Sequence, residues 1–201
     1  MQSIRPTLLL CLGALTLRSA PAGQTPSGTL VVTNMNDHTA SILDLGTGRT
    51  LATLPTGQGP HEVAVSHDGR WAVVTNYGVR GQPGNSLTVI DLADPTVERT
   101  IDLGRYQRPH GVAFLPGDST LLVTAEAAGR VLRIAFRSGA VLDSIPTRGR
   151  ASHMLAVASS GTRWITANIV DGTISRFDGP GEPVVLPVAR AVEGIAISSD
   201  G

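Results

Sequence analysis

The sequence is poor in the residues on which several common functions depend. Its 201 residues include one cysteine, Cys11, which lies in an apolar segment near the N-terminus. Without that segment the chain has no thiol, which excludes disulfides, zinc–thiolate sites and thiol catalysis. Aromatic residues make up 3% of the chain, which argues against a stacking platform for bases or sugars. Basic and acidic residues number 16 each, so there is no basic footprint for nucleic acid.

The sequence also lacks the short motifs of several enzyme classes. It contains no G-x-S-x-G elbow, no H-E-x-x-H pair and no Walker loop. Its glycine-rich stretches "GTGRT" and "GQGP" precede no expected helix, which argues against a phosphate cradle. No stretch of helical length has apolar residues at i, i+3 and i+4, so helix is expected to be nearly absent.

The N-terminal residues 1–22 have the pattern of an export signal. Arg5 provides the positive charge, Leu8–Leu17 forms a short apolar run, and Ala20–Ala22 offers a small-x-small cleavage site. The alternative is a buried apolar strand. The signal predicts an exported protein, periplasmic or secreted, with a mature start near Gly23 and no membrane insertion after cleavage. Residues 23–28 then form a polar lead-in.

From Thr29 onward the chain is dominated by short runs of alternating apolar and polar residues. Runs such as "TLVVTN", "ASILDL" and "TLATL" are rich in Val, Ile, Leu and Thr and are separated by Asn, Asp and Gly. The 23 glycines and 13 prolines supply residues for many tight turns. This pattern is typical of strands joined by turns.

A phrase recurs along the chain at a steady spacing. It appears as "GPHEVAVSHDGRWAVVTNYG", "RPHGVAFLPGDSTLLVTAEAAG", "ASHMLAVASSGTRWITANIVDG" and "VEGIAISSDG". The residue before the histidine position falls at Pro60, Pro109, Ser152 and Val192, which gives separations of 49, 43 and 40 residues. A second landmark, at Thr33, Thr75, Thr124 and Thr166, recurs at intervals of 42, 49 and 42. A four-stranded unit of roughly 40–50 residues is typical of a β-propeller blade.

The fold class predicted is therefore an all-β, incomplete β-propeller of four-stranded antiparallel blades. In the second unit the expected strands are 62–66, 71–76, 86–91 and 97–103, and "GVRGQPGNS" is expected to be an enlarged loop between the middle two. The expected units are 29–57, which lacks a first strand, then 58–104, 105–147, 148–189 and the start of a fifth at 190–201. Either a truncated ring or a half-ring that closes by dimerisation explains this count, and both leave open sheet edges.

Four segments carry a resemblance to a known family. "AVVTNYG", "RPHGVAF", "SHDGRWAVVTN" and "SLTVIDL" resemble the YVTN-repeat β-propeller family of bacterial exported proteins, over about 29–201. The chain departs from the family pattern at Ala125, where Asn is usual, at Ser152 in place of Pro, and at Glu193 in place of His. The resemblance implies the propeller fold but no single activity, because propellers include binding modules, lactonases and redox enzymes.

In a propeller the loop that enters the innermost strand and the loop after the next strand lie on the same face. We therefore expect His61, His110 and His153 to lie around one opening, with His67 on the opposite face beside Asp68. The same face should carry Asn76, Asn168 and Glu193. This face is the predicted binding surface for a protein or small-molecule ligand of unknown identity.

The repeated histidines have three interpretations. They brace the loops, contact a ligand or partner, or bind a metal or haem, in which case Glu62, Glu126 and Glu193 add oxygen ligands or a general base. No cofactor is predicted, and a transition metal on the three histidines is the minor alternative. The sequence favours a binding or scaffold module. The alternative function is an enzyme, either a lactonase-like hydrolase with a divalent metal or a redox propeller.

Overall fold

The computed structural model describes residues 26–201, in which strands account for almost all regular structure. The predicted signal peptide, 1–22, and the first residues of the polar lead-in lie outside the described residues. Helix within residues 26–201 is limited to two 3₁₀ turns, Met35–Asp37 and Glu126–Ala128. Within the described residues, no helix is long and apolar enough to cross a membrane.

Fifteen strands form one three-stranded and three four-stranded antiparallel sheets in chain order. The first sheet contains β1 (Thr29–Asn34), β2 (Thr39–Asp44) and β3 (Thr50–Pro55); the second β4 (Pro60–Val65), β5 (Trp71–Val79), β6 (Gln82–Asp91) and β7 (Thr96–Asp102). The third contains β8 (Pro109–Phe114), β9 (Thr120–Ala125), β10 (Arg130–Ala135) and β11 (Val141–Pro146); the fourth β12 (Ser152–Val157), β13 (Trp164–Asn168), β14 (Thr173–Phe177) and β15 (Val184–Pro187).

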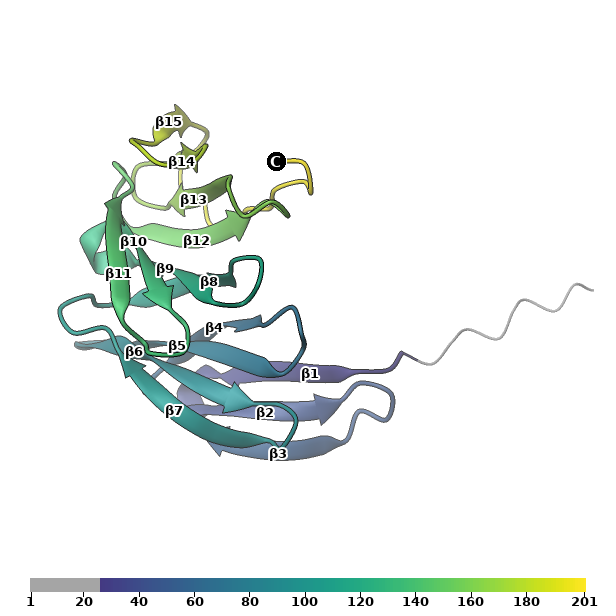
Figure 1. Ribbon diagram of the computed structural model, residues 1–201. Helices are drawn as coiled ribbons and strands as arrows, with labels where there is room; N and C mark the ends of the chain where they lie inside the picture. The colour runs from purple at the N-terminus through teal and green to yellow at the C-terminus, as the bar shows by residue number, and fades with distance from the viewer. Residues whose placement is uncertain (1–25) are drawn as a thin grey trace, which may run out of the picture.

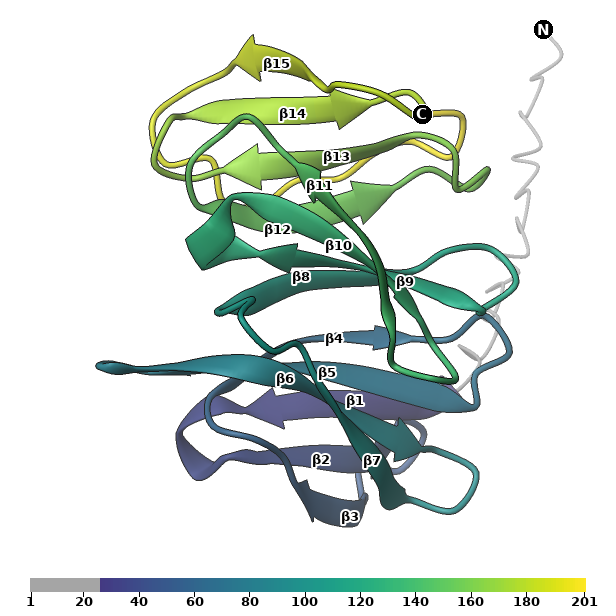
Figure 2. The ribbon, with the colours of Figure 1, turned by 60° about the vertical axis from the view of Figure 1, so that its left-hand side comes forward.

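The four sheets are stacked face to face in chain order (Figures 1 and 2). β4, β8 and β12, the first strands of three successive sheets, lie on the inner side, where β8 contacts both of the others. The last strands, β3, β7, β11 and β15, lie on the outer side (Figure 1). The molecule is thus an incomplete β-propeller, as the repeat predicts.

The hydrophobic core is divided among the spaces between neighbouring sheets. Ile42 from the first sheet packs with Val74 and Ile90 from the second. Val89 from the second packs with Leu121 and Ile134 from the third. This arrangement follows from the alternation of apolar residues, because each blade has to bury both of its faces. Adjacent blades therefore hold one another in place, and side chains at the inner ends of neighbouring blades come close together.

The prediction of an enlarged loop in the second unit is wrong. Residues in "GVRGQPGNS" continue β5 and β6 as a long hairpin, in which Gly78 pairs with Pro83 and Val79 with Gln82. Its tip extends beyond the other sheets (Figure 2). The hairpin forms because Gly78 and Gly81, at φ of 94° and 81°, adopt backbone conformations that favour glycine. Asn76 consequently lies within a strand and not in a loop.

The expected strand at the start of a fifth unit is also not formed. Residues 190–201 follow the surface of the fourth sheet without regular structure, and the amide of Ser159 donates to the carbonyl of Ser199. An innermost strand needs a second strand as its antiparallel partner, and no described strand pairs with this segment. The loop geometry of the repeat is nevertheless kept, because Ala191 has the same left-handed φ, 55°, as the equivalent Arg108.

Candidate functional site

The three predicted histidines occupy equivalent positions, second in β4, β8 and β12. Immediately after Pro60, Pro109 and Ser152 the pairing with the next strand shifts register, so each of these strands contains one extra residue. A bulge of this kind turns a side chain away from the direction that strict alternation would give it. The repeated phrase therefore encodes a bulge that presents the histidine.

The loop before each histidine has the same backbone conformation. Gly59, Arg108 and Ala151 have φ of 58°, 55° and 53°, the left-handed region. Gly59 is required there, because a Cβ would lie 2.2 Å from the carbonyl oxygen of Gly78. A non-glycine residue in this region is strained by about 1–2 kcal/mol, so the packing around Arg108 and Ala151 has to hold the loop.

Two of the repeated threonines, Thr33 and Thr124, fix the backbone of a histidine in the next blade. Thr33 Oγ1 donates to the carbonyl of His61 at 2.8 Å, and Thr124 Oγ1 donates to that of His153 at 2.7 Å. Thr124 also accepts from the amide of Gly111 in the bulge of its own blade, at 2.8 Å. The two sequence landmarks thus contact each other, and the two bonds to histidine carbonyls each join neighbouring blades.

The structure brings the three imidazoles together. The ring centroids of His110 and His153 are 3.5 Å apart, those of His61 and His110 are 4.1 Å apart, and those of His61 and His153 are 6.4 Å apart. His110 lies between the other two and is 1% exposed. His61 is more open, with 32% of its side chain exposed.

Two acids and a tyrosine complete the group. Glu126 accepts from the Tyr77 hydroxyl at 2.6 Å and pairs with Nδ1 of His153 at 2.7 Å. Glu62 lies 3.4 Å from Nδ1 of His61. We call the six residues together the histidine site: His61, His110, His153, Glu62, Glu126 and Tyr77.

Burial and proximity determine the charge states in the histidine site. Burial, reinforced by the neighbouring His153 and His61, lowers the pKa of His110 to about 4, so this imidazole is neutral at pH 7. Hydrogen bonding to His61 lowers the pKa of Glu62. Burial raises the pKa of Glu126, but hydrogen bonds to His153 and Tyr77 outweigh it, and the net pKa is lowered. Two carboxylates therefore face a neutral central imidazole.

His110 is the least satisfied residue of the histidine site. Neither its Nδ1 nor its Nε2 has a hydrogen-bond partner among residues 26–201, although both atoms are buried. A buried polar atom without a partner costs about 1–3 kcal/mol. His61, Glu62 and His110 each offer one ligand atom, and these three atoms lie within 4.8 Å of one another. Three donors at this spacing are close enough to hold a metal ion.

Asn76 and Asn168 do not join the histidine site. Asn76 is 1% exposed; it donates to Ser86 Oγ at 3.0 Å and Thr88 Oγ1 at 3.1 Å, and accepts from the amide of Gly57 at 3.1 Å. Asn168 is fully buried and is bonded to Ser152, Thr173 and Ser175. The prediction that these two side chains lie on the ligand face is wrong. Both are buried, and their hydrogen bonds go to neighbouring groups of the scaffold.

Glu193 also lies apart from the histidine site. It is exposed in the segment without strands, and no described hydrogen bond or ion pair joins it to a histidine. His67 lies in the turn between β4 and β5, where it pairs with Asp118 of the third blade at 2.6 Å. That turn is at the opposite end of β4 from His61, as the repeat predicts.

Tyr77 is the member of the histidine site that the sequence interpretation missed. Its ring centroid is 5.4 Å from those of both His61 and His110, and the guanidinium of Arg108 lies 4.8 Å from it. The repeat contained the signal: Tyr77 follows Asn76 as Glu126 follows Ala125. The amides of Tyr77 and Glu126 bond the equivalent carbonyls of Gly59 and Arg108.

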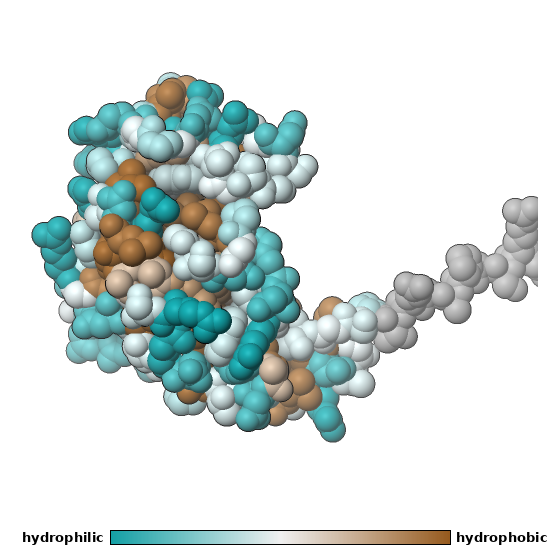
Figure 3. All heavy atoms as spheres, in the orientation of Figure 1, coloured by the Kyte–Doolittle hydropathy of each residue, from teal (hydrophilic) through white to brown (hydrophobic). Residues whose placement is uncertain are grey.

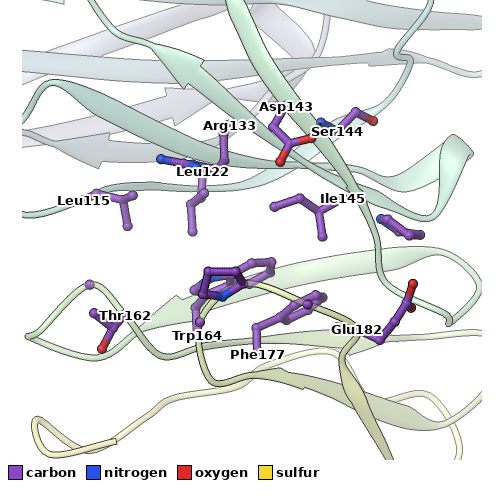
Figure 4. A pocket seen from close by; sticks show the side chains of 15 residues that line it. Leu115, Leu122, Arg133, Asp143, Ser144, Ile145, Thr162, Trp164, Phe177 and Glu182 are labelled. Carbon is purple, nitrogen blue, oxygen red and sulfur yellow. Dashed lines mark hydrogen bonds between the residues drawn. The ribbon is translucent and has the colours of Figure 1, made fainter.

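A cavity of about 530 Å³ lies elsewhere, between the third and fourth sheets. Figure 4 shows Trp164 and Phe177 on one side of it, facing Leu115, Leu122 and Ile145. The two aromatic rings are stacked, with centroids 3.6 Å apart. Brown apolar surface is also seen over the outer part of the third sheet (Figure 3). We assign the cavity to the packing space between two blades, because none of the histidines lines it.

Comparison with known proteins supports the fold alone. No family model matches the sequence, and no curated protein does. Among solved structures, the chain is similar to hydrazine synthase of Kuenenia stuttgartiensis, with a TM-score of 0.68 and 18% identity over 87% of this chain and 53% of that one. It is also similar to a protein of unknown function from Desulfotomaculum acetoxidans, with a TM-score of 0.67 and 16% identity over 80% of this chain and 53% of that one. The chain thus spans about half the length of two solved structures whose fold it resembles.

Proposed function

We propose that this chain is part of an exported β-propeller of the YVTN type that acts as a binding module for a small ligand or ion. The binding surface is the histidine site. The observation that carries the proposal is the position of His110, which is buried between two other imidazoles and whose ring nitrogens have no partner in the part of the chain that the structure describes. Residues that only brace a structure are hydrogen-bonded, as Asn76 and Asn168 are.

The neighbouring groups support this proposal. His61 and Glu62 are each about one third exposed, so a ligand can reach the histidine site from solvent. His153 and Glu126 are mostly buried and paired, so their positions are fixed before binding. A site with fixed polar groups and one open side loses little entropy on binding.

Binding is tested by nuclear magnetic resonance on protein labelled with ¹⁵N in the histidine rings. Zinc sulfate, inorganic phosphate, acetate and glucose represent divalent ions, anions and sugars. At least one probe is expected to shift the signals of His61, His110 and His153 and to leave His67 unchanged. A site that only braces the loops would show no shift with any probe.

Export is tested separately. Mass spectrometry of the protein recovered from the periplasm or medium is expected to show a mature start near Gly23. Recovery of the protein there with an intact Met1 end would contradict cleavage of the signal.

The Glu126–His153 pair favours hydrolysis as a second candidate function. A carboxylate that holds an imidazole at 2.7 Å is the arrangement that orients a general base. Lactone hydrolysis followed by pH-stat would test it, and Glu126→Gln should abolish any activity found. Absence of turnover in the zinc-loaded and the metal-free protein would rule out this candidate for simple lactones.

A further inference from the structure

We propose that His61, Glu62 and His110 bind one divalent transition-metal ion of the zinc type, beside an imidazole, His153, that Glu126 orients. This inference rests on the proposed function and specifies the ligand of the same site. It assigns a role to the unpartnered imidazole of His110 and to the carboxylate of Glu62 beside it.

The first argument is the chemistry of the donors. Neutral imidazole nitrogens and a carboxylate oxygen are suited to zinc, copper, nickel or iron, whereas magnesium and calcium prefer sets made of oxygen alone. Two histidines and one glutamate leave a fourth position for water or an external ligand. A site of this composition is therefore selective for transition metals and remains open on the side where His61 and Glu62 are exposed.

The second argument is geometry. The three ligand atoms lie within 4.8 Å of one another, and Glu62 is already 3.4 Å from His61. In a tetrahedral zinc site two donors lie about 3.4 Å apart, since each bond is about 2.1 Å long. Side-chain movements of about 1–1.5 Å therefore close the set without moving the strands.

The third argument is the hydrogen bonding of His110. Its two buried nitrogens have no partner among the described residues, so a bond from one of them to a metal would satisfy an atom that is otherwise left without a bond. The bulge in β8 and the contacts between blades fix the backbone on which it stands. The imidazole is thus held in place at a depth where solvent gives it little compensation.

The surroundings support a positive ion. Glu62 and Glu126 bring two negative charges to the site, and the guanidinium of Arg108 lies 4.8 Å from the ring of Tyr77. Glu126 pairs with Nδ1 of His153 and so holds this imidazole in place beside the three ligands. A cation bound at the three ligands therefore has both direct donors and a neighbouring negative charge.

The experiment is a zinc titration of the folded chain, stripped with a chelator and followed by calorimetry, with bound metal counted by elemental analysis. We expect one zinc ion per chain and no binding of magnesium or calcium. His110→Phe removes one ligand without leaving a polar gap and should weaken zinc binding by about 100-fold or more, since even supporting residues contribute 10–100-fold. His61→Gln, at a more exposed ligand, should weaken it similarly.

His67→Gln is the matched control, because it removes a histidine from the opposite end of the same blade. Its zinc affinity should equal that of the wild type within about 2-fold, and circular dichroism should show that all three variants are folded. Zinc bound equally well by His110→Phe would overturn the metal assignment. If zinc does not bind but acetate, phosphate or glucose still shifts the His110 ring signals, the metal proposal fails and the binding module stands. If no probe shifts them, both proposals fail.

Discussion

Two polar positions of the repeat are both buried but differ in their hydrogen bonding. Asn76 and Asn168 are both buried, and each is hydrogen-bonded to at least three groups of its own surroundings. His110 is equally buried, but neither of its nitrogens has a partner among the described residues. Both positions recur with the same period, so recurrence alone does not distinguish a residue that braces the fold from one that binds a ligand. The hydrogen bonds that each side chain makes do distinguish them.

The direction of the side chain explains the difference. The amide of each asparagine lies over the third strand of its own blade, where serine and threonine hydroxyls are within reach. The histidine, presented by a bulge in the innermost strand, points toward the equivalent histidines of other blades. Each blade thus satisfies its own asparagine, whereas the histidines meet only when several blades are assembled.

The largest effect is expected at the bracing position. Asn76→Ala should lower the free energy of unfolding by about 3 kcal/mol, because it removes the bonds of Asn76 to the Gly57 amide, the half-buried Ser86 hydroxyl and the buried Thr88 hydroxyl, and leaves Gly57 only its longer contact of 3.4 Å with Thr88 Oγ1. Urea denaturation measures this loss. Asn34→Ala, at the equivalent but less buried position, is the control and should cost about 1 kcal/mol. Equal losses in the two variants would show that burial does not determine the role of this position.

Next in size is a pH effect centred on His110. Its pKa in the folded protein is about 4, below the 6.5 of an unperturbed histidine, so the folded state favours the neutral ring. The corresponding stability is complete above pH 6.5 and is lost as the pH falls toward 4. Between pH 7 and pH 5, metal-free wild type should lose about 2 kcal/mol more than His110→Phe.

Urea denaturation at the two pH values, with a chelator present, checks this expectation. Glu62 and Glu126, whose pKa values are lowered, also lose their contribution in acid, but they do so in both proteins. The comparison therefore reports His110 together with its charge interaction with these two carboxylates. The same loss in wild type and variant would mean that His110 is not the group responsible.

A smaller effect is expected where the two blades are joined. Thr124→Val keeps the shape of the side chain but removes the bonds to the His153 carbonyl and the Gly111 amide, at a cost of about 1 kcal/mol. Because the histidine backbone is then less fixed, zinc affinity should fall by several-fold. Thermal unfolding and calorimetry measure the two quantities. Unchanged zinc affinity at reduced stability would separate the blade contact from the histidine site.

The smallest effect is expected in the loop before His153. Ala151 has a φ of 53°, a conformation that glycine adopts without strain. Ala151→Gly should raise the free energy of unfolding by about 0.5–1 kcal/mol, with unchanged zinc binding. Arg108→Gly is a poor control, since it also removes the contact with Tyr77. A destabilised Ala151→Gly would show that the backbone at this position is not strained.

The sequence by itself determined the propeller fold and the grouping of the three histidines. The period of the repeat, the alternation of apolar residues and the equivalent positions of His61, His110 and His153 are all properties of sequence order. A repeat that folds the same way each time must place equivalent residues at equivalent points. The sequence did not predict that "GVRGQPGNS" forms a long hairpin, because glycines with positive φ occur in loops and in hairpin turns alike.

Only the tertiary structure decided which repeated polar residues are satisfied. Asn76 and His110 both looked like members of one surface, since a sequence shows position in the repeat but not the direction of a side chain. Tyr77 joins the histidine site through Glu126, a residue of another blade, and Glu193 stays outside it. These outcomes depend on contacts between blades, which form only when packing brings distant residues within hydrogen-bond distance.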